Sequence, residues 1–422
     1  MCASKPIPND QLRVLHIITR MILGGAQENT LLSVEGLSQL PKYNVTLLSG
    51  VDNGPEGDLL SRAKRTVNLT ILPDMRRNIA PLSDMVTLWK LCRVIRRGKY
   101  HIVHTHSAKG GVLGRLAAWL VGTPIIIHTH HGLAFHDYQH WLVNRAWRTI
   151  EQLSTRISHH LISVSELLID KAVDANIAPR DKFSTIYSGM ELDWFTKTNA
   201  DANAVKKEFN IPHDSPIIGK IARLFPLKGH DQLLDAAPVI VRNNPKVRFF
   251  LVGDGILQQH LKERARQQGI LDNFIFAGLV PRERIPEMIA VMDVVVHTSL
   301  REGLARVLPQ ALAMGKPCVS FAIDGAPEVV IPDETGYLIE PNDSDGLAKA
   351  VSKLVNDPQL CQRMGEAGRK RVDPAFRAET MVHQIAEVYR DMCQKHKERI
   401  VRFNERQLLS RNPIAVSTSS SH

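Results

Sequence analysis

The chain has 422 residues, which exceeds the size of one ordinary domain and predicts two domains. Hydrophobic residues make up 44% of the sequence and charged residues 23%, as in ordinary globular proteins. The formal net charge of +10 favours anionic partners. The sequence has no RNP aromatic signature, zinc finger or basic-zipper pattern, which excludes these nucleic-acid-binding modules. Nucleic acid is therefore not an expected partner.

In the N-terminal half, short β-branched runs alternate with longer helical patterns, which is typical of βαβ units and a parallel sheet. Helical patterns cover Ala26–Leu40, Leu82–Arg97 and His140–Ser154. The predicted strands are Val14–Ile18, Val45–Leu48, Leu69–Leu72, Ile102–His104, Ile125–His128, Leu161–Val164 and Thr185–Tyr187. The alternation predicts a Rossmann-like domain over residues 1–195.

The pattern starts again after a polar stretch, Thr196–Ser215, which is the predicted linker. The predicted strands of the second half are Ile217–Ile221, Arg248–Val252, Phe274–Phe276, Asp293–Val296 and Pro317–Phe321. They predict a second α/β domain over residues 210–375, with ligands at the carboxyl ends of the strands. A long helical region follows at Pro374–Lys397, and the basic, Ser-rich tail at 398–422 is expected to be disordered.

Cysteine usage and hydropathy indicate the compartment. The five cysteines are odd in number and scattered, which predicts reduced thiols in a cytoplasmic protein. The first residues lack a signal-peptide pattern. The most apolar stretch, Gly110–Ile127, is interrupted by Arg115 and Pro124, so no spanning helix is expected.

Glycines follow the first strand at Gly24-Gly25 and open a helical pattern. Glycine lets backbone N–H groups approach an anion at a helix N-terminus, although an ordinary tight turn would use the same residues. The motif is not G-x-G-x-x-G, and no acidic residue follows at the distance expected for ribose binding, which disfavours a dinucleotide site.

Histidines gather after two predicted strands, where an α/β sheet opens onto its ligand. Two His-x-His pairs are typical of a divalent metal site, but no Asp or Glu stands near either pair to complete it, so no metal is expected. The alternatives are a histidine that hydrogen-bonds a substrate hydroxyl or acts as acid or base, and packed, satisfied histidines. These histidines are His104, His106, His128, His130, His131 and His136.

Two cations follow the first strand of the second half. Arg223 and Lys228 lie in a loop that ends at Gly229, before a new helix. A guanidinium fork and an ammonium suit a diphosphate, and the helix start adds free N–H groups. The strand near Val296 leads into a second loop with Glu302 and Gly303, before a helix that carries Gln310.

Together these motifs resemble the donor domain of glycosyltransferase family 4, which comprises retaining enzymes with the GT-B fold. The family has a strand followed by Arg-x-x-x-x-Lys-Gly, then Gly-x-Gly, then a Glu-Gly loop, with a second Glu eight residues after the first. The matching residues here are Arg223, Lys228-Gly229, Gly253-Asp254-Gly255 and Glu302-Gly303, and in the N-terminal half Gly24-Gly25 and Thr129–Gly132. The likeness covers about residues 12–390 in consistent order.

The resemblance implies an α/β protein with two Rossmann-like domains facing each other across a cleft. Residues 1–195 would bind the acceptor, residues 210–375 the donor, and the helix at 376–397 would cross back to the first domain. The implied reaction moves a hexose from a nucleotide-diphosphate sugar to a sugar, glycan or lipid-linked acceptor, as in polysaccharide biosynthesis.

The resemblance also implies roles for individual residues. Arg223 and Lys228 would hold the diphosphate and replace a metal ion, so no cofactor is expected. Glu302 would bind the transferred sugar, and His131 would be the acceptor-side histidine, or His130 if the register differs by one. The implied donor-binding residues are Arg223, Lys228, Gly253, Glu302, Gly303, Leu304, Ala305, Arg306 and Gln310. Attack from the front face, with the leaving phosphate accepting the proton, would need no enzyme nucleophile.

The sequence departs from the family pattern at two places. Gln310 stands where the family has the second glutamate, and an amide accepts from one ribose hydroxyl while it donates to the other. Leu304 and Ala305 replace the usual Phe-Gly. The triplet Asp343–Asp345 has the form of the D-x-D metal motif of another glycosyltransferase fold, but its place before a helix favours a capping loop.

The N-terminal half carries an excess of positive charge, which bears on whether the protein contacts a membrane. Residues 1–195 hold 22 Lys and Arg against 16 Asp and Glu. The segment Trp89–Lys99 alternates basic and apolar residues and would either rest on anionic lipid at the inner face of a membrane or form an ordinary helix with a solvated basic face. Two other functions compete: a catalytically silent nucleotide-sugar-binding protein and a histidine-dependent metallohydrolase.

Overall fold

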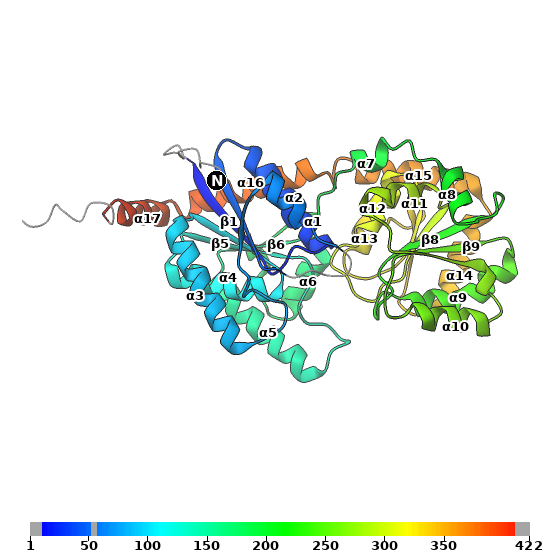
Figure 1. The fold of residues 1–422 in the computed structure, drawn as a ribbon, viewed down its shortest axis with the longest axis horizontal. Helices are drawn as coiled ribbons and strands as arrows, with labels where there is room; N and C mark the ends of the chain where they lie inside the picture. Colours follow the sequence, from blue (N-terminus) through cyan, green and yellow to red (C-terminus); the bar gives the residue numbers. More distant parts are fainter. Residues whose placement is uncertain (1–10, 52–56, 410–422) are drawn as a thin grey trace, which may run out of the picture. The chain divides into compact units, whose positions relative to one another are not determined.

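The computed structural model describes residues 11–51 and 57–409, which form two compact units (Figure 1). The first unit comprises the residues up to Val164, Ile169–Ile186 and the residues from Met381 onward. The second comprises Ser165–Leu168 and Tyr187–Thr380. The chain therefore enters the second unit at Tyr187, ahead of the predicted linker. That stretch is polar because it contains a short surface helix, α8 (Ala202–Glu208), which packs on α11 (Ile285–Ala290).

The first unit is built on a seven-stranded parallel sheet with the order β3-β2-β1-β4-β5-β6-β7. Its strands are β1 (Leu12–Ile18), β2 (Tyr43–Ser49), β3 (Asn68–Ile71), β4 (Ile102–His106), β5 (Ile125–His130), β6 (His160–Ser163) and β7 (Phe183–Thr185). All seven were predicted, but β7 ends at Thr185, where the predicted strand begins. The error arose because the β-branched run continues past the last ladder residue.

Helices cover both faces of this sheet, as a doubly wound fold requires (Figure 1). One face carries α3 (Pro81–Gly98), α4 (Ala108–Val121) and α5 (Trp141–Arg156). The other carries α1 (Gly25–Gln39), α2 (Leu60–Thr66) and α16 (Ala378–Lys395). The core under α3 and α4 is apolar and includes Leu15, Ile17, Leu91, Ile95 and Val103.

The second unit is a six-stranded parallel sheet with the order β10-β9-β8-β11-β12-β13. Its strands are β8 (Ile217–Ile221), β9 (Arg248–Val252), β10 (Phe274–Gly278), β11 (Val294–His297), β12 (Cys318–Phe321) and β13 (Gly336–Ile339). The first five were predicted and β13 was missed. The helices are α7 (Asp193–Thr196), α8, α9 (His230–Asn243), α10 (Gln258–Gln267), α11, α12 (Val307–Ala313), α13 (Ala326–Val329), α14 (Ser344–Val355) and α15 (Pro358–Val372).

Both sheets share one topology, in which the strand order reverses between the first and fourth strands of the unit. These reversals lie at β1/β4 in the first unit and at β8/β11 in the second. Loops that leave neighbouring strands in opposite directions open a crevice at such a point. The histidines of β4 and the Arg223 and Glu302 loops therefore stand where an α/β sheet binds its ligand.

The C-terminal region departs from expectation. Residues of the predicted disordered tail form α17 (Lys397–Leu409), so that prediction is wrong for this part. The apolar residues of α17 are spaced three and seven residues apart, at Ile400 and Phe403 and at Val401 and Leu408, which is a helical periodicity that composition alone does not reveal. The Ser-rich end of the tail, residues 410–422, lies outside the described residues. Among residues 11–51 and 57–409, no helix is both long enough and apolar enough to span a bilayer.

Candidate active site

The loop after β8 is shaped by close backbone packing. Gly229 has φ +68° and lies so close to the Thr298 carbonyl that a Cβ atom would come within 1.6 Å of it. Any side chain at this position would push the loop away from β11, so only glycine allows the observed approach. The glycine therefore fixes where Lys228 leaves the loop, just before α9 begins at His230.

Lys228 and Glu302 form the centre of the site. Lys228 Nζ lies 2.5 Å from Glu302 Oε1, and their side chains are 23% and 21% exposed. The backbone N–H of Glu302 donates to the Asp324 carboxylate at 2.7 Å, which fixes the start of its loop. The two loops are thus locked together, and the ion pair still reaches solvent.

The charge of Glu302 is set by its neighbours. Burial raises the pKa of its carboxyl group, but the Lys228 ammonium and other contacts outweigh this and leave the pKa below its usual value. Burial lowers the pKa of nearby His297 to about 3, so this imidazole is neutral at physiological pH. The site therefore holds one ammonium, one carboxylate and a neutral histidine.

Arg223 stands at the entrance of the same loop. It is exposed, and its guanidinium carbon lies 5.2 Å from the centre of the Phe225 ring. The Arg223 carbonyl accepts a hydrogen bond from His230 Nε2 at 3.0 Å. The backbone is thus held while the guanidinium remains at the surface, a suitable geometry for binding an anion.

Gly253 has φ +136°, and a Cβ atom there would lie 2.2 Å from the Ala222 carbonyl. The predicted Gly-x-Gly turn therefore lets the β9 loop pass directly against the base of the Arg223 loop. Gly253 contributes a close backbone approach within this cluster and no side-chain chemistry.

The residues that precede α12 are largely buried. Gly303, Leu304 and Ala305 are buried, and the Arg306 guanidinium donates to the Gly189 carbonyl at 3.1 Å. The Arg306 side chain is therefore already engaged, and the contact with a donor that the resemblance implies would use the Arg306 backbone N–H. Gln310 is half-buried in α12, and its side chain has no hydrogen-bond partner among the described residues.

A buried lysine behind this site was missed by sequence reasoning. Lys220 on β8 is 1% exposed, and its Nζ donates to Thr298 Oγ1 at 2.9 Å. Burial lowers its pKa to about 7, with Lys228 acting in the same direction and Glu302 opposing it. A lysine inside the apolar run Ile217–Ile221 was the signal that could have identified it.

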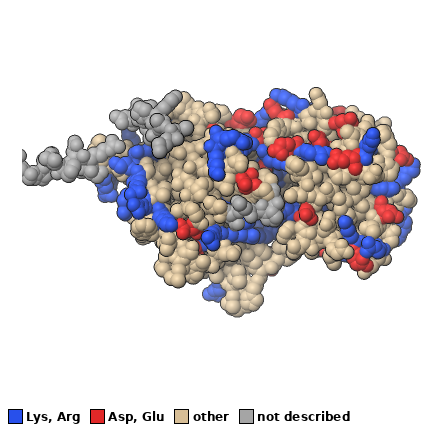
Figure 2. Space-filling model, viewed as in Figure 1, with Lys and Arg blue, Asp and Glu red and all other residues tan. Residues whose placement is uncertain are grey.

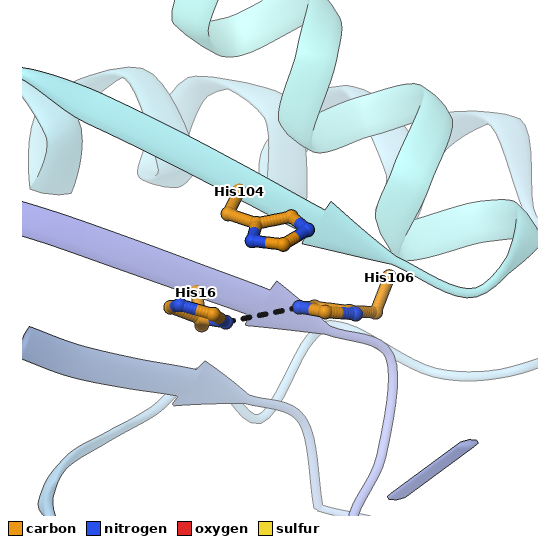
Figure 3. A group of neighbouring side chains, drawn as sticks. All are labelled: His16, His104 and His106. Carbon is orange, nitrogen blue, oxygen red and sulfur yellow. Dashed lines mark hydrogen bonds between the residues drawn. The ribbon is translucent and has the colours of Figure 1, made fainter. Parts of the chain in front are cut away.

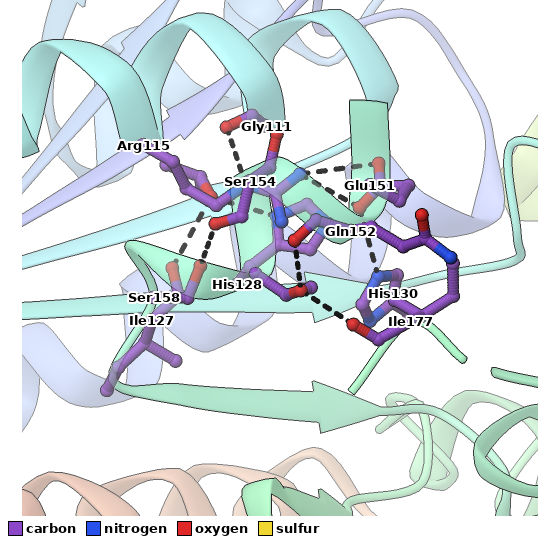
Figure 4. Close-up of polar contacts among 12 residues, drawn as sticks. Gly111, Arg115, Ile127, His128, His130, Glu151, Gln152, Ser154, Ser158 and Ile177 are labelled. Carbon is purple, nitrogen blue, oxygen red and sulfur yellow. Dashed lines mark hydrogen bonds and ion pairs between the residues drawn. The ribbon is translucent and has the colours of Figure 1, made fainter. Parts of the chain in front are cut away.

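In the first unit, alternation along the strands sorts the histidines onto the two faces of the sheet. His128 and His130 lie on the face of α4 and α5, where His130 Nε2 is 3.6 Å from Glu151 and Glu151 pairs with Arg115 at 3.0 Å (Figure 4). His104 and His106 lie on the other face, with His131 beyond β5. His130 is 4% exposed, whereas His131 is half-buried, so the two candidates for the acceptor-side histidine differ in exposure.

Two groups in the first unit bring metal-ligating atoms within 4.8 Å of one another: His16, His104 and His106, and His128, His130 and Glu151. Glu151 was missed as a neighbour of the second group because it lies on α5, distant in sequence. Its carboxylate is already engaged by the Arg115 guanidinium, which would oppose a cation at that place.

Three further predictions concern residues outside the donor site: the Gly24-Gly25 pair, His136 and Asp343. Gly24 has φ 177°, an extended conformation open to any residue, and Gly25 is the exposed first residue of α1, so neither is required by its backbone. His136 is half-buried after β5, outside both histidine groups. Asp343 caps α14 by accepting from Gly346 N at 2.8 Å, which confirms the capping loop.

Two family models match the chain, one described as "Glycosyl transferases group 1" over residues 201–371 and one as "Glycosyl transferase 4-like domain" over residues 24–189. The UDP-Gal:alpha-D-GlcNAc-diphosphoundecaprenol alpha-1,3-galactosyltransferase of Escherichia coli is 29% identical over 387 residues, covering 91% of this chain and 98% of that protein. The capsular polysaccharide biosynthesis glycosyltransferase CapM of Staphylococcus aureus is 26% identical, covering 75% of this chain and 83% of that protein.

Solved structures share the fold. The structure of Anabaena HepE in complex with UDP has a TM-score of 0.74 and 20% identity, covering 90% of this chain and 100% of that chain. Sucrose-phosphate synthase from Thermosynechococcus elongatus has a TM-score of 0.73 and 20% identity, covering 91% and 100%. At this identity the likeness shows the architecture, with a Rossmann-like parallel sheet in each unit.

Proposed function

Because this chain belongs to the family 4 glycosyltransferases with the GT-B fold, we propose that its second domain binds a nucleotide-diphosphate sugar through Arg223, Lys228 and Glu302. The single observation that carries the proposal is the Lys228–Glu302 pair, which is held by two locked loops at the β8/β11 reversal and still reaches solvent. Lys228 and Arg223 would neutralise the diphosphate, and Glu302 would accept hydrogen bonds from sugar hydroxyls.

The proposed chemistry needs positive charge at the leaving group. The bond between the anomeric carbon and the diphosphate oxygen breaks, a bond to the acceptor oxygen forms on the same face, and the acceptor proton passes to the leaving phosphate. Two cations fixed beside that oxygen would stabilise the developing charge and make a metal ion unnecessary. His131 would face the acceptor hydroxyl in the first domain.

The proposed acceptor is a lipid-linked glycan at an anionic membrane on the cytoplasmic side. The first support is the relative whose printed name includes a diphosphoundecaprenol, since this chain covers 98% of it. The second support is α3, where Leu82, Met85, Val86 and Trp89 are 77%, 62%, 45% and 59% exposed. Their spacing places them on one stripe of the helix.

Basic residues continue from this stripe toward the end of α3. Arg93 lies 5.5 Å from the Trp89 ring centre, and Arg96 and Arg97 occupy the last turn. In Figure 2 Lys and Arg side chains gather over α3, whereas basic and acidic side chains are interspersed on the second unit. An apolar stripe bordered by cations is the arrangement that favours an anionic bilayer surface.

The activity test uses purified protein with radiolabelled UDP- and GDP-sugars and a GlcNAc-diphosphate-polyprenol acceptor. We expect transfer from one donor, retention at the anomeric carbon by NMR of the product, and full activity in EDTA. Binding of a donor without transfer to this acceptor would contradict the proposed acceptor, and activity restored only by a divalent ion would contradict metal independence.

The membrane test compares sedimentation with vesicles containing about one-third phosphatidylglycerol and with neutral phosphatidylcholine vesicles. We expect binding to the anionic vesicles, loss of binding in Trp89→Glu, and no loss in Trp194→Glu, a matched tryptophan in the second unit. Equal binding of wild type and Trp89→Glu would overturn the role of α3.

A further inference from the structure

We propose that Tyr389 and three buried histidines couple the tautomer of His131 to their own through one continuous chain of hydrogen bonds, which makes them positioning residues for the acceptor side. The importance of His131 for the reaction rests on the proposed function, but the tautomer itself does not. The chain draws on four elements of the first unit: β1 with His16, β4 with His104 and His106, β5 with Thr129, and α16 with Tyr389.

The outer part of the chain starts at His131. Its Nε2 lies 3.0 Å from His106 Nδ1, and His106 Nε2 lies 3.0 Å from His16 Nδ1. Figure 3 shows His16 and His106 on neighbouring strands with their rings side by side and His104 beside them. Both ring nitrogens of His106 are therefore used within the chain.

The inner part continues through α16. His16 Nε2 lies 3.0 Å from the Tyr389 hydroxyl, which lies 2.7 Å from His104 Nδ1. His104 Nε2 lies 2.7 Å from Thr129 Oγ1, where the chain ends. Both ring nitrogens of His16 and His104 are used as well, so Tyr389 joins His104 to the run of His16, His106 and His131.

Such a chain has only two consistent arrangements of protons. A neutral imidazole has one donor and one acceptor nitrogen, and a tyrosine hydroxyl has one proton to donate. If His106 carries its proton on Nδ1, then His16 and His104 must do so too, and His131 accepts at Nε2. In the second arrangement His106, His16 and His104 carry their protons on Nε2, and His131 donates from Nε2. A combination of the two arrangements would place two N–H groups or two lone pairs against each other at one of the contacts. The tautomer of His131 is thus coupled to Tyr389.

Burial keeps the chain neutral, which this ordering requires. His16, His104 and Tyr389 are 0% exposed, and His106 is 1% exposed. Burial lowers the pKa of His16 to about 3, lowers the pKa values of His104 and His106 well below the usual range, and raises that of the Tyr389 hydroxyl. His131, the outermost of these four histidines, is only half-buried, so part of this residue is exposed.

The test replaces Tyr389 by phenylalanine, which retains the ring and removes the hydroxyl that joins the two halves. The matched control is Tyr43→Phe: Tyr43 is also buried, packs edge-on against Tyr389 at 5.8 Å, and donates to the Ala386 carbonyl of the same helix, but lies outside the chain. Protein labelled with ¹⁵N-histidine is measured by long-range ¹H–¹⁵N spectroscopy, with the His131 signals assigned from His131→Gln.

We expect the same His131 tautomer populations in the wild type and in Tyr43→Phe, and different populations in Tyr389→Phe. With the transfer assay, we expect kcat to fall about 3- to 10-fold in Tyr389→Phe, the scale of one hydrogen bond, with the KM for the donor unchanged. An unchanged His131 tautomer in folded Tyr389→Phe would overturn the proposal.

Metal analysis of the wild type provides the other decisive outcome. Stoichiometric zinc or manganese that is lost in His16→Ala would make His16, His104 and His106 metal ligands and would overturn the hydrogen-bonded chain. The spectroscopic measurement needs no substrate. If the wild type transferred no sugar, the proposed function would be contradicted. The His131 tautomer could still be measured and would test the hydrogen-bonded chain by itself.

Discussion

Two ion pairs, Arg115–Glu151 in the first unit and Lys228–Glu302 in the second, differ in exposure. Arg115 and Glu151 lie 3.0 Å apart with side chains 0% and 3% exposed, enclosed by α4, α5 and β5 (Figure 4). Lys228 and Glu302 lie 2.5 Å apart, with 23% and 21% of their side chains exposed. A fully enclosed pair has no room for a ligand and contributes only to the stability of the fold. In a partly exposed pair, either side chain can leave the other and bind a substrate group instead.

The enclosed pair should give the largest effect on stability. Glu151→Ala leaves the Arg115 guanidinium without its carboxylate in the interior, and we expect a loss of about 3–5 kcal/mol in the free energy of unfolding. Urea denaturation followed by circular dichroism measures it. The double variant Arg115→Met/Glu151→Leu should recover most of the loss, because it removes both charges.

A loss below about 1 kcal/mol in Glu151→Ala would mean that water or another group replaces the carboxylate, and the contrast between the two pairs would disappear. The effect of Glu151→Ala on donor binding by the second unit should be negligible in folded protein.

The half-exposed pair should instead govern activity. Lys228→Ala removes a cation proposed to stabilise the leaving diphosphate, and we expect kcat/KM for transfer to fall about 10²- to 10³-fold, as when one preorganised donor is removed from an active site. Thermal unfolding should change less than in Glu151→Ala, since about a fifth of each side chain is exposed and water can reach Glu302. Lys246→Ala is the control, because Lys246 forms a surface pair with Asp214. Equal kcat/KM values in Lys228→Ala and in the control would contradict the proposed donor site.

These two pairs also show what sequence reasoning can reach. Arg223 and Lys228 were found because a strand, a glycine and both cations lie within one short segment, and Glu302 because its loop precedes a recognisable helix. Glu151 is 36 residues from Arg115, and no local pattern links them. Tyr389 is 285 residues from His104, so their hydrogen bond depends on how α16 packs on the sheet.

The same distinction applies to the fold. The strands in the middle of each sheet are almost fully buried and begin with β-branched or apolar residues, so they were predicted. The edge strand β13 has four residues, Gly336–Ile339, and only Gly336 among them is fully buried. A short, half-buried edge strand resembles a loop in sequence, which is why it was missed.

A third prediction concerns the charge beneath the exposed pair. The pKa of Lys220 is about 7 in the folded protein, below its ordinary value of 10.5. Below pH 7 both states carry the proton and the full cost of burying the charge destabilises the fold; this cost fades as the pH rises towards 10.5. Lys220→Met should therefore stabilise the protein at pH 7, and the gain should shrink by about 1.4 kcal/mol per pH unit above that. Urea denaturation of both proteins at pH 7 and pH 9 measures the difference.

The control for this effect is Lys246→Met, whose side chain is 69% exposed and which should show no such pH dependence. A gain in Lys220→Met that is equal at both pH values would come from packing alone and would contradict a shifted lysine.

The smallest effect is expected at the rim of the exposed pair, where the Gln310 side chain makes no hydrogen bond within the described part of the chain and is proposed to bind the ribose. Gln310→Ala removes that interaction, and we expect the Kd for UDP to rise about 3- to 10-fold. Gln310→Glu restores an acceptor for both ribose hydroxyls and should lower the Kd below that of the wild type. Isothermal titration calorimetry with UDP and with phosphate alone separates ribose binding from diphosphate binding. If Gln310→Ala weakened the binding of phosphate and of UDP equally, the amide would act on the Lys228–Glu302 pair itself. Separate binding sites for the diphosphate and the ribose would then be contradicted.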